Sequence, residues 1–232
     1  MIEAQDVSCT FARNPFSKEG FMAVSPVSIQ FIDGERYAIV GESGSGKTTL
    51  ARMIAGLQRP TTGNIYVDGM PVYGKHKVHT NYFKEVQIIQ QDSSSALDPK
   101  MSVGRSIEEP LLCFFHLDKE ERKKRCHDLM NLCNLPVEYY SRLPAELSGG
   151  EQKRVAIARA LAAEPKCLIF DEATNGFDLP LRKKIIEEIV DLQRKLAFTL
   201  IFITHDMELA VVIADVILVM KNSALIEQVE FS

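Results

Sequence analysis

The chain has 232 residues, 46% of them hydrophobic, and a formal net charge of -4. That length and apolar content are enough for a buried core in one large domain or two small ones. The slightly acidic charge argues against a broad basic face for nucleic acid. No apolar run approaches the roughly 20 residues that span a bilayer, and the N-terminal residues do not resemble a secretion signal. A cytosolic protein is therefore expected.

Five cysteines, odd in number and widely spaced, favour reduced thiols over a disulfide framework. Together with two histidines, three of them could bind zinc. That alternative set is Cys113, His116, Cys126, His127 and Cys133. However, positions i, i+3, i+4 and i+7 from Cys126 to Cys133 are all apolar, which favours one buried helical stripe.

Short apolar runs bounded by turn residues predict β-strands in the first part of the chain. They cover positions 2–7, 27–31, 36–40, 64–67 and 86–89. Later runs are almost continuously apolar and alternate with helical patterns, which is typical of parallel strands buried on both faces. These runs cover positions 167–170, 199–204 and 216–220. The expected fold class is α/β with a layered sheet core.

Helical periodicity replaces the strand pattern in the middle of the chain, at positions 103–115 and 118–135. This predicts a helical subdomain at 92–148, inserted into a sheet core made of 1–91 and 149–232, all within one domain. Spaced apolar residues between 185 and 196 predict a further amphipathic helix. Asp206 is expected to cap a helix at 207–214.

A glycine-rich loop follows the predicted strand at 36–40 and precedes a helical pattern at 49–57, which is the context of a phosphate-binding loop. It reads Gly41, Glu42, Ser43, Gly44, Ser45, Gly46, Lys47, Thr48. Its backbone N–H groups and the helix N-terminus favour phosphate oxygens. Lys47 is expected to reach the β and γ phosphates, Thr48 to offer a hydroxyl to Mg²⁺, and Thr49 to lie beside the α phosphate. A plain glycine-rich turn is the alternative.

Polar side chains follow two of the predicted buried strands. Asp171 and Glu172 come after the run at 167–170, which delivers two carboxylates to the carboxyl edge of the sheet beside the phosphate loop. Adjacent acids at a strand end also occur in ordinary turns. His205 follows the run at 199–204, where a histidine could equally be structural.

A second anion site is predicted where another helical pattern begins, at 151–163. Ser148, Gly149 and Gly150 precede it, so their N–H groups and the Ser148 hydroxyl are available at a helix N-terminus.

Downstream of the phosphate loop, residues 147–152 read LSGGEQ. Together the two motifs resemble those of the ATPase subunit of ATP-binding cassette (ABC) transporters, and the resemblance extends over nearly the whole chain. The resemblance implies hydrolysis of ATP with Mg²⁺. It implies that Asp171 holds Mg²⁺ through water and that Glu172 is the general base. It also implies that His205 contacts the γ phosphate and that Gln91 senses Mg²⁺ and the attacking water, with Gln90 as the alternative.

In that family two cassettes pack head to tail. The resemblance therefore implies that Ser148, Gly149 and Gly150 close over ATP held by the partner, and that Asp178 lies at the dimer interface. Residues 175–178 read NGFD where the family commonly has Ser-Ala-Leu-Asp, and Glu151 replaces the commoner Gln.

An aromatic residue of this family usually stacks on adenine from a position before the phosphate loop. Phe11 is the expected one, because its placement after the first predicted strand matches the family. Phe16 and Phe21 are alternatives.

The segment 91–111 resembles the corresponding region of bacterial peptide and nickel importer ATPases, although Ser93 and Asp98 replace the usual Pro and Asn. This implies an ATP-hydrolysing motor on the cytoplasmic face of the membrane. Its implied partners are a second ATPase subunit in a homo- or heterodimer, two transmembrane permease subunits and, indirectly, an extracytoplasmic solute-binding protein. No nucleic-acid partner is expected. The alternatives are a soluble ABC-type ATPase acting on nucleic acid or ribosomes, and an efflux motor.

Overall fold

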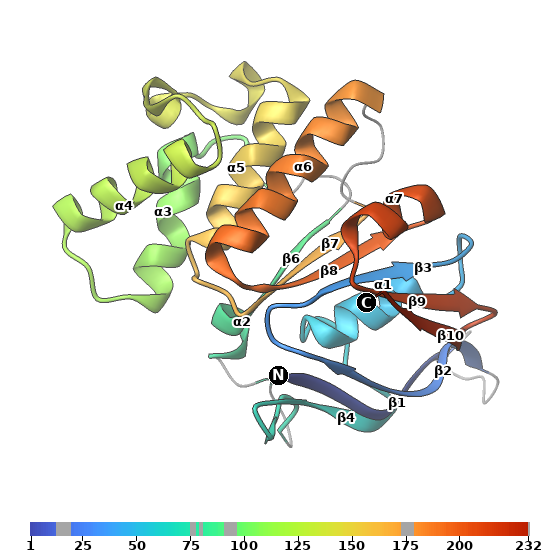
Figure 1. The fold of residues 1–232 in the computed structure, drawn as a ribbon. Helices are drawn as coiled ribbons and strands as arrows, with labels where there is room; N and C mark the ends of the chain where they lie inside the picture. The colour runs from blue at the N-terminus through green and yellow to red at the C-terminus, as the bar shows by residue number, and fades with distance from the viewer. Residues whose placement is uncertain (13–19, 75–77, 79–80, 91–96, 173–178, 232) are drawn as a thin grey trace.

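Two β-sheets and the helices packed on them build the fold (Figure 1). The computed structural model describes residues 1–12, 20–74, 78, 81–90, 97–172 and 179–231. The smaller sheet is antiparallel and has the order β2-β1-β4-β5, with β1 Ile2–Ala12, β2 Gly20–Phe31, β4 Thr62–Val67 and β5 Met70–Pro71. The larger sheet has the order β10-β9-β3-β8-β7-β6. Its strands are β3 Arg36–Val40, β6 Val86–Ile89, β7 Cys167–Asp171, β8 Thr199–Thr204, β9 Val216–Lys221 and β10 Ala224–Glu230.

The larger sheet is parallel from β9 to β6, and only β10 joins it antiparallel. Every residue of β7 and β8 is buried, as expected for apolar runs covered on both faces. The prediction of a layered α/β sheet core is confirmed. The sequence did not predict β5 or β10.

Helix α1 (Lys47–Ile54) lies between the two sheets (Figure 1). Its Leu50 and Met53 are fully buried in a cluster that also holds Ile39 of β3 and Ile65 of β4. The opposite face of the larger sheet is covered by α5 (Gly149–Leu161), α6 (Leu179–Leu196) and α7 (Met207–Ile213). The helix that begins in the phosphate loop is thus held on both sides.

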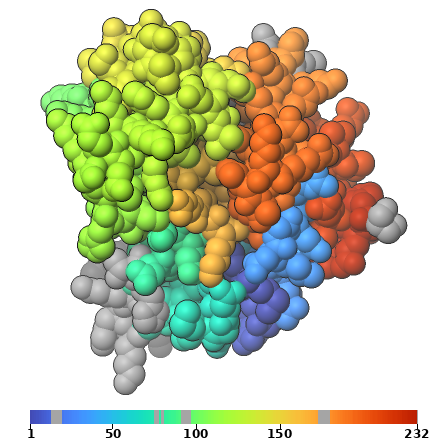
Figure 2. Space-filling view, turned by 60° about the vertical axis from the view of Figure 1, so that its left-hand side comes forward, coloured from blue at the N-terminus to red at the C-terminus, as the bar shows by residue number. Residues whose placement is uncertain are grey.

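The described chain between β6 and α5 is helical. It holds α3 (Val103–Phe114), α4 (Lys119–Leu132) and the 3-10 helices η1 (Val137–Ser141) and η2 (Pro144–Glu146), while the short α2 (Tyr82–Glu85) precedes β6. Asp118 and Glu121 form a capping box that starts α4. In Figure 2 the segment from α3 to η2 forms the green to yellow part of the surface, beside the orange residues of α6.

The predicted buried stripe of α4 is confirmed, because Cys126, Met130 and Cys133 lie in the core. All five cysteines are free. Within the described ranges, no group of three or more metal-ligating side chains comes together. None of the described helices is both long enough and apolar enough to cross a membrane.

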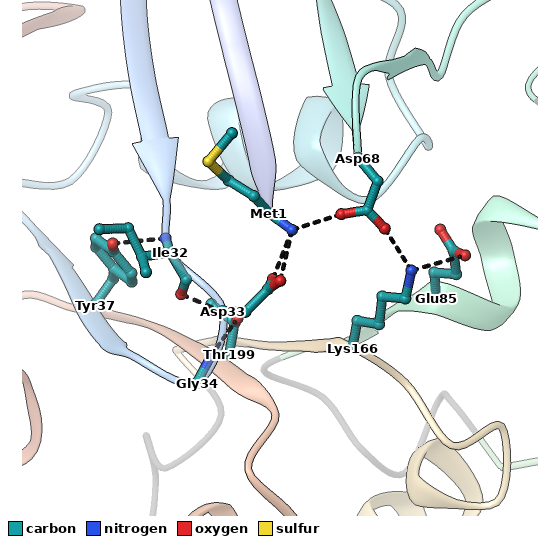
Figure 3. Close-up of polar contacts among 9 residues, drawn as sticks. All are labelled: Met1, Ile32, Asp33, Gly34, Tyr37, Asp68, Glu85, Lys166 and Thr199. Atoms are coloured by element: carbon teal, nitrogen blue, oxygen red, sulfur yellow. Dashed lines mark hydrogen bonds and ion pairs between the residues drawn. The ribbon is translucent and has the colours of Figure 1, made fainter.

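A group of charges joins the two sheets near the N-terminus (Figure 3). Asp68, directly after β4, accepts hydrogen bonds from Lys166 Nζ at 2.6 Å and from the Met1 ammonium at 2.7 Å. Lys166, which precedes β7, also lies 3.3 Å from Glu85. Hydrogen bonds from these two cations hold the pKa of Asp68 at about 2. The carboxylate of Asp68 therefore links β4 to the start of β7.

Candidate nucleotide-binding site

The phosphate loop connects β3 to α1 and turns sharply at its glycines. Gly41 has φ +151°, and a Cβ there would lie 2.1 Å from the carbonyl oxygen of Met220. Gly46 has φ +101°, and a Cβ there would lie 2.3 Å from the carbonyl oxygen of Ala23. Only glycine fits at these two positions, because both the backbone conformation and the space exclude a side chain. The loop can therefore curl tightly before α1 begins.

Lys47 fills the inside of this curve. Its Nζ donates to the carbonyl oxygens of Gly41 at 2.8 Å and Glu42 at 2.7 Å, and the side chain is only 4% exposed. Burial lowers the pKa of Lys47, while the charges of Glu172 and Asp171 oppose that shift. An ammonium held by neutral carbonyls is ready to exchange them for phosphate oxygens, since hydrogen bonds between charged groups are stronger.

Thr48 begins the link between the loop and β7. Its hydroxyl donates to the Asp171 carboxylate at 3.0 Å, although 123 positions separate the two residues. Asp171 is 5% exposed, so burial raises its pKa and the Thr48 hydrogen bond opposes the rise. A hydroxyl and a carboxylate side by side are oxygen ligands of the kind that Mg²⁺ prefers. The residues present therefore fit a magnesium ion.

Glu172 follows Asp171 in an unusual backbone conformation. Its φ is +50°, and its N–H donates to the carbonyl oxygen of Ile203 in β8 at 3.1 Å. The left-handed region is uncommon for a residue with a side chain and often marks functional sites. The turn ends β7 at this residue and leaves the Glu172 side chain half-buried.

His205 lies at the end of β8, and its side chain is exposed. The next residue, Asp206, caps α7 as predicted, by accepting the N–H of Leu209 at 3.1 Å. Val40 of β3 pairs with Thr204 of β8. The phosphate loop and His205 therefore leave the sheet at the same edge as the two carboxylates on β7.

The second predicted anion site is the start of α5. Ser148 is its N-cap, and Ser148 and Gly149 are exposed while Gly150 is buried. Glu151 completes a capping box: it accepts both the backbone N–H and the hydroxyl of Ser148, each at 2.8 Å. These hydrogen bonds lower the pKa of Glu151. The capping role of Glu151 was not predicted, although its spacing from Ser148 is itself a capping-box signal.

Three of the predicted residues lie outside the described residues: Gln91, Asp178 and the alternative Phe16. Phe11 of β1 pairs across the sheet with Phe21 of β2, and both side chains are exposed. Both therefore remain candidates for stacking on adenine. Lys153 of α5 is also buried, which the sequence did not predict.

The glycine loop, the buried lysine and the hydroxyl–carboxylate pair define a P-loop ATPase. The family model described as "ABC transporter" matches residues 24–175. With well over half of its length matched, the chain belongs to the ABC transporter family and is an ATP-binding, ATP-hydrolysing subunit.

Similar proteins include nickel import ATP-binding proteins NikE. The NikE of Brucella abortus is 39% identical over 205 residues, which cover 88% of this chain and 77% of the relative. The NikE of Escherichia coli is 36% identical over 230 residues, which cover 98% of this chain and 86% of the relative.

A solved structure of the ATP-binding cassette MJ0796, a dimer bound to ADP and Pi, has a TM-score of 0.86 and 27% identity, covering 99% of this chain and 98% of that one. The cbiO1 of Clostridium perfringens, part of the ABC transporter complex cbiONQ, has a TM-score of 0.85 and 28% identity, covering 99% of this chain and 88% of that one.

Proposed function

We propose that this chain is the ATP-hydrolysing subunit of a bacterial-type importer that takes up nickel, peptides or a related small solute. The similarity to NikE over most of the chain carries the proposal and favours import over efflux or work on ribosomes. The net charge of -4 gives no support to a nucleic-acid partner. Its place is the cytoplasmic face of the membrane, as a peripheral subunit.

Hydrolysis starts from the hydrogen bonds already in place around the phosphate loop. Lys47 exchanges the carbonyl oxygens of Gly41 and Glu42 for the β and γ phosphates, and Thr49 lies beside the α phosphate. Thr48 and Asp171 would hold Mg²⁺, Asp171 through water, and Gln91 would be a further contact. When bound, Mg²⁺ neutralises negative charge that develops on the phosphate oxygens.

Glu172 acts as the general base toward the attacking water. Its position at the end of β7, next to the proposed magnesium ligand Asp171, supports this role. His205, at the same sheet edge, contacts the γ phosphate and helps to orient the water. A well-placed base contributes about 100-fold to 10,000-fold to rate.

Closure requires a second cassette. Ser148 and Gly149 are exposed at the start of α5, where ATP held by another subunit can reach them. In the single chain, the backbone N–H and the hydroxyl of Ser148 both donate to Glu151. On binding, the Ser148 hydroxyl is released to the γ phosphate, while Asp178 lies at the dimer interface. Ser148 is the last residue of the proposed helical subdomain at 92–148, and α5 begins the second part of the proposed sheet core at 149–232.

A groove beside β6 is suited to a short helix of a permease subunit. The groove has a volume of about 300 Å³ and lies between β6, α3 and α5. Its apolar lining includes Phe83, Ile88, Pro110, Cys113, Phe114 and Ala160. An ion pair of 2.6 Å between Arg159 and Glu109 joins α5 to α3 at the same groove. Movement of α3 relative to β6 would therefore displace a permease helix bound in this groove.

Cys113 offers a direct test of this docking, because it is exposed while the other four cysteines are buried. A cleavable thiol-reactive photo-crosslinker is attached to Cys113 in native membranes, and the crosslinked proteins are identified by mass spectrometry. We expect a polytopic permease, with no crosslink in the matched Cys113→Ser control. Crosslinks to soluble proteins alone, in membranes that retain the chain, would refute the transport proposal while leaving ATP hydrolysis intact.

A further inference from the structure

Lys153 of α5 is a buried charge outside the phosphate site. Among the charged side chains that the structure describes as buried, Lys47 and Asp171 belong to the phosphate site, and Lys153 is the third. Its side chain is 1% exposed, and its Nζ donates to the carbonyl oxygen of Gln90 at 3.2 Å. This hydrogen bond joins α5 to the residue that directly follows β6.

Packing alone does not account for a lysine at this position. An ammonium taken out of water carries a large desolvation penalty unless hydrogen bonds offset it, and apolar residues of similar volume often replace buried charges without loss of stability. Methionine could fill the same space. What lysine adds is a directed donor, which fixes the distance between α5 and Gln90.

The two ends of this hydrogen bond lie near two different nucleotide sites of the proposed dimer. Lys153 lies one helical turn after Gly149 and Gly150, on the same face of α5, so it moves with the start of that helix. At the other end, Gln90 follows Ile89, which pairs with Phe170, the residue before Asp171. The bond therefore runs from the start of α5 to the sheet edge that carries the carboxylates.

We propose that Lys153 is a positioning residue that couples the two nucleotide sites of the dimer. The start of α5 contacts ATP held by the partner, while the end of β6 borders the ATP of its own subunit. When α5 shifts as the dimer closes, the Lys153 ammonium carries the end of β6 with it. The inference rests on the head-to-tail dimer proposed above.

Three variants of the full chain test this coupling: Lys153→Met, Lys153→Arg and Ile157→Val. Methionine removes the donor and keeps the length, arginine keeps a donor, and Ile157→Val loosens the buried face of the same helix. We expect kcat to fall about tenfold in Lys153→Met, within the usual range of coupling between sites. Its affinity for the first ATP bound should stay within about twofold of wild type, while the cooperative gain in affinity at the second site should be lost.

Lys153→Arg should recover at least half of kcat and the cooperative response, and Ile157→Val should keep both. Thermal unfolding of each variant separates loss of fold from loss of coupling. A folded Lys153→Met protein with wild-type kcat and cooperativity would overturn the proposal. So would an equal loss in Ile157→Val, because it would make Lys153 a packing residue only.

A separate experiment tests whether the dimer forms at all. The Glu172→Gln variant should form an ATP-dependent dimer in size-exclusion chromatography, whether or not Lys153 is replaced. Absence of that dimer refutes head-to-tail pairing of two copies of this chain, and with it the coupling through Lys153 between two such copies. A dimer in both backgrounds, with cooperativity lost in Lys153→Met alone, supports the coupling.

Discussion

Replacing Thr48 by valine tests the hydroxyl–carboxylate pair most directly. Valine keeps the shape of threonine but cannot donate to Asp171, whose carboxylate is 5% exposed. Hydrogen bonds to a charged acceptor contribute about 1.5–3 kcal/mol, so the free energy of unfolding should fall by that amount near neutral pH. The buried carboxylate would then lose a donor that stabilises its charged form.

The cost of Thr48→Val should depend on pH, with a sign fixed by Asp171. Burial raises its folded pKa above the ordinary value of 3.8, so the folded state holds the proton more tightly and stability falls as pH rises from that value through the raised pKa. Loss of the Thr48 donor raises the folded pKa further, by about one unit per 1.4 kcal/mol. The variant therefore differs least from wild type below pH 3.8, where Asp171 is protonated in both.

Urea unfolding without nucleotide, at several pH values between 4 and 8, measures this difference, provided that the unfolding slope is unchanged. Thr48→Ser is the matched control, because it retains the hydroxyl and should stay close to wild type. In the ATPase assay, Thr48→Val should also require more Mg²⁺ than Thr48→Ser. A cost that is the same at every pH, or below about 0.5 kcal/mol throughout, would refute the reasoning about the buried carboxylate.

Three other predictions concern the site and the fold, and one of them has a matched control variant. Glu172→Gln should retain binding of MgATP but lose about 100-fold or more of turnover, and a wild-type rate of phosphate release would remove Glu172 from the mechanism. Gly46→Ala should lower stability by at least about 1–2 kcal/mol in urea unfolding, from its left-handed backbone alone. The matched Gly44→Ala change has φ +80° but open space around its Cβ, so equal costs would contradict the predicted clash at Gly46. Asp68→Asn removes a carboxylate with a pKa of about 2. The ion pairs of Asp68 should stabilise the fold by about 1 kcal/mol or less, because they are exposed. In acid unfolding this contribution should be present above pH 3.8 and be lost as pH falls toward 2. A loss of stability in Asp68→Asn that persists at pH 2 would contradict the assignment to the charged carboxylate.

Local sequence patterns predicted the buried strands well. The bounds of β3, β6 and β8 agree with the predicted runs, because each is apolar and ends at a turn or polar residue. By contrast, β10 carries exposed and charged side chains along much of its length, so no apolar pattern marks it. Its pairing with β9 is a tertiary contact, which a local pattern does not contain.

In the site, too, local sequence patterns predicted some features, while contacts between distant residues required the folded structure. Strand ends followed by acids predicted where Asp171 and Glu172 lie, since parallel strands share a carboxyl edge. The 3.0 Å contact between Thr48 and Asp171 spans 123 positions and needed the folded chain. Lys153 was missed for a different reason: lysine is among the residues least often buried, and nothing in its neighbours signals that its ammonium reaches Gln90.

The hydrogen bonds of Lys47 to its own loop bear on how fast the protein accepts its ligand. With α1 fixed between two sheets and the ammonium bridging Gly41 and Glu42, the loop is preorganised before any nucleotide arrives. Ligand entry then requires only that one side chain exchange partners, and the conformational entropy of the loop has already been lost on folding. Binding of ATP should therefore proceed at an ordinary diffusional rate without a slow rearrangement. The later closure of the proposed dimer should then limit the rate of the cycle.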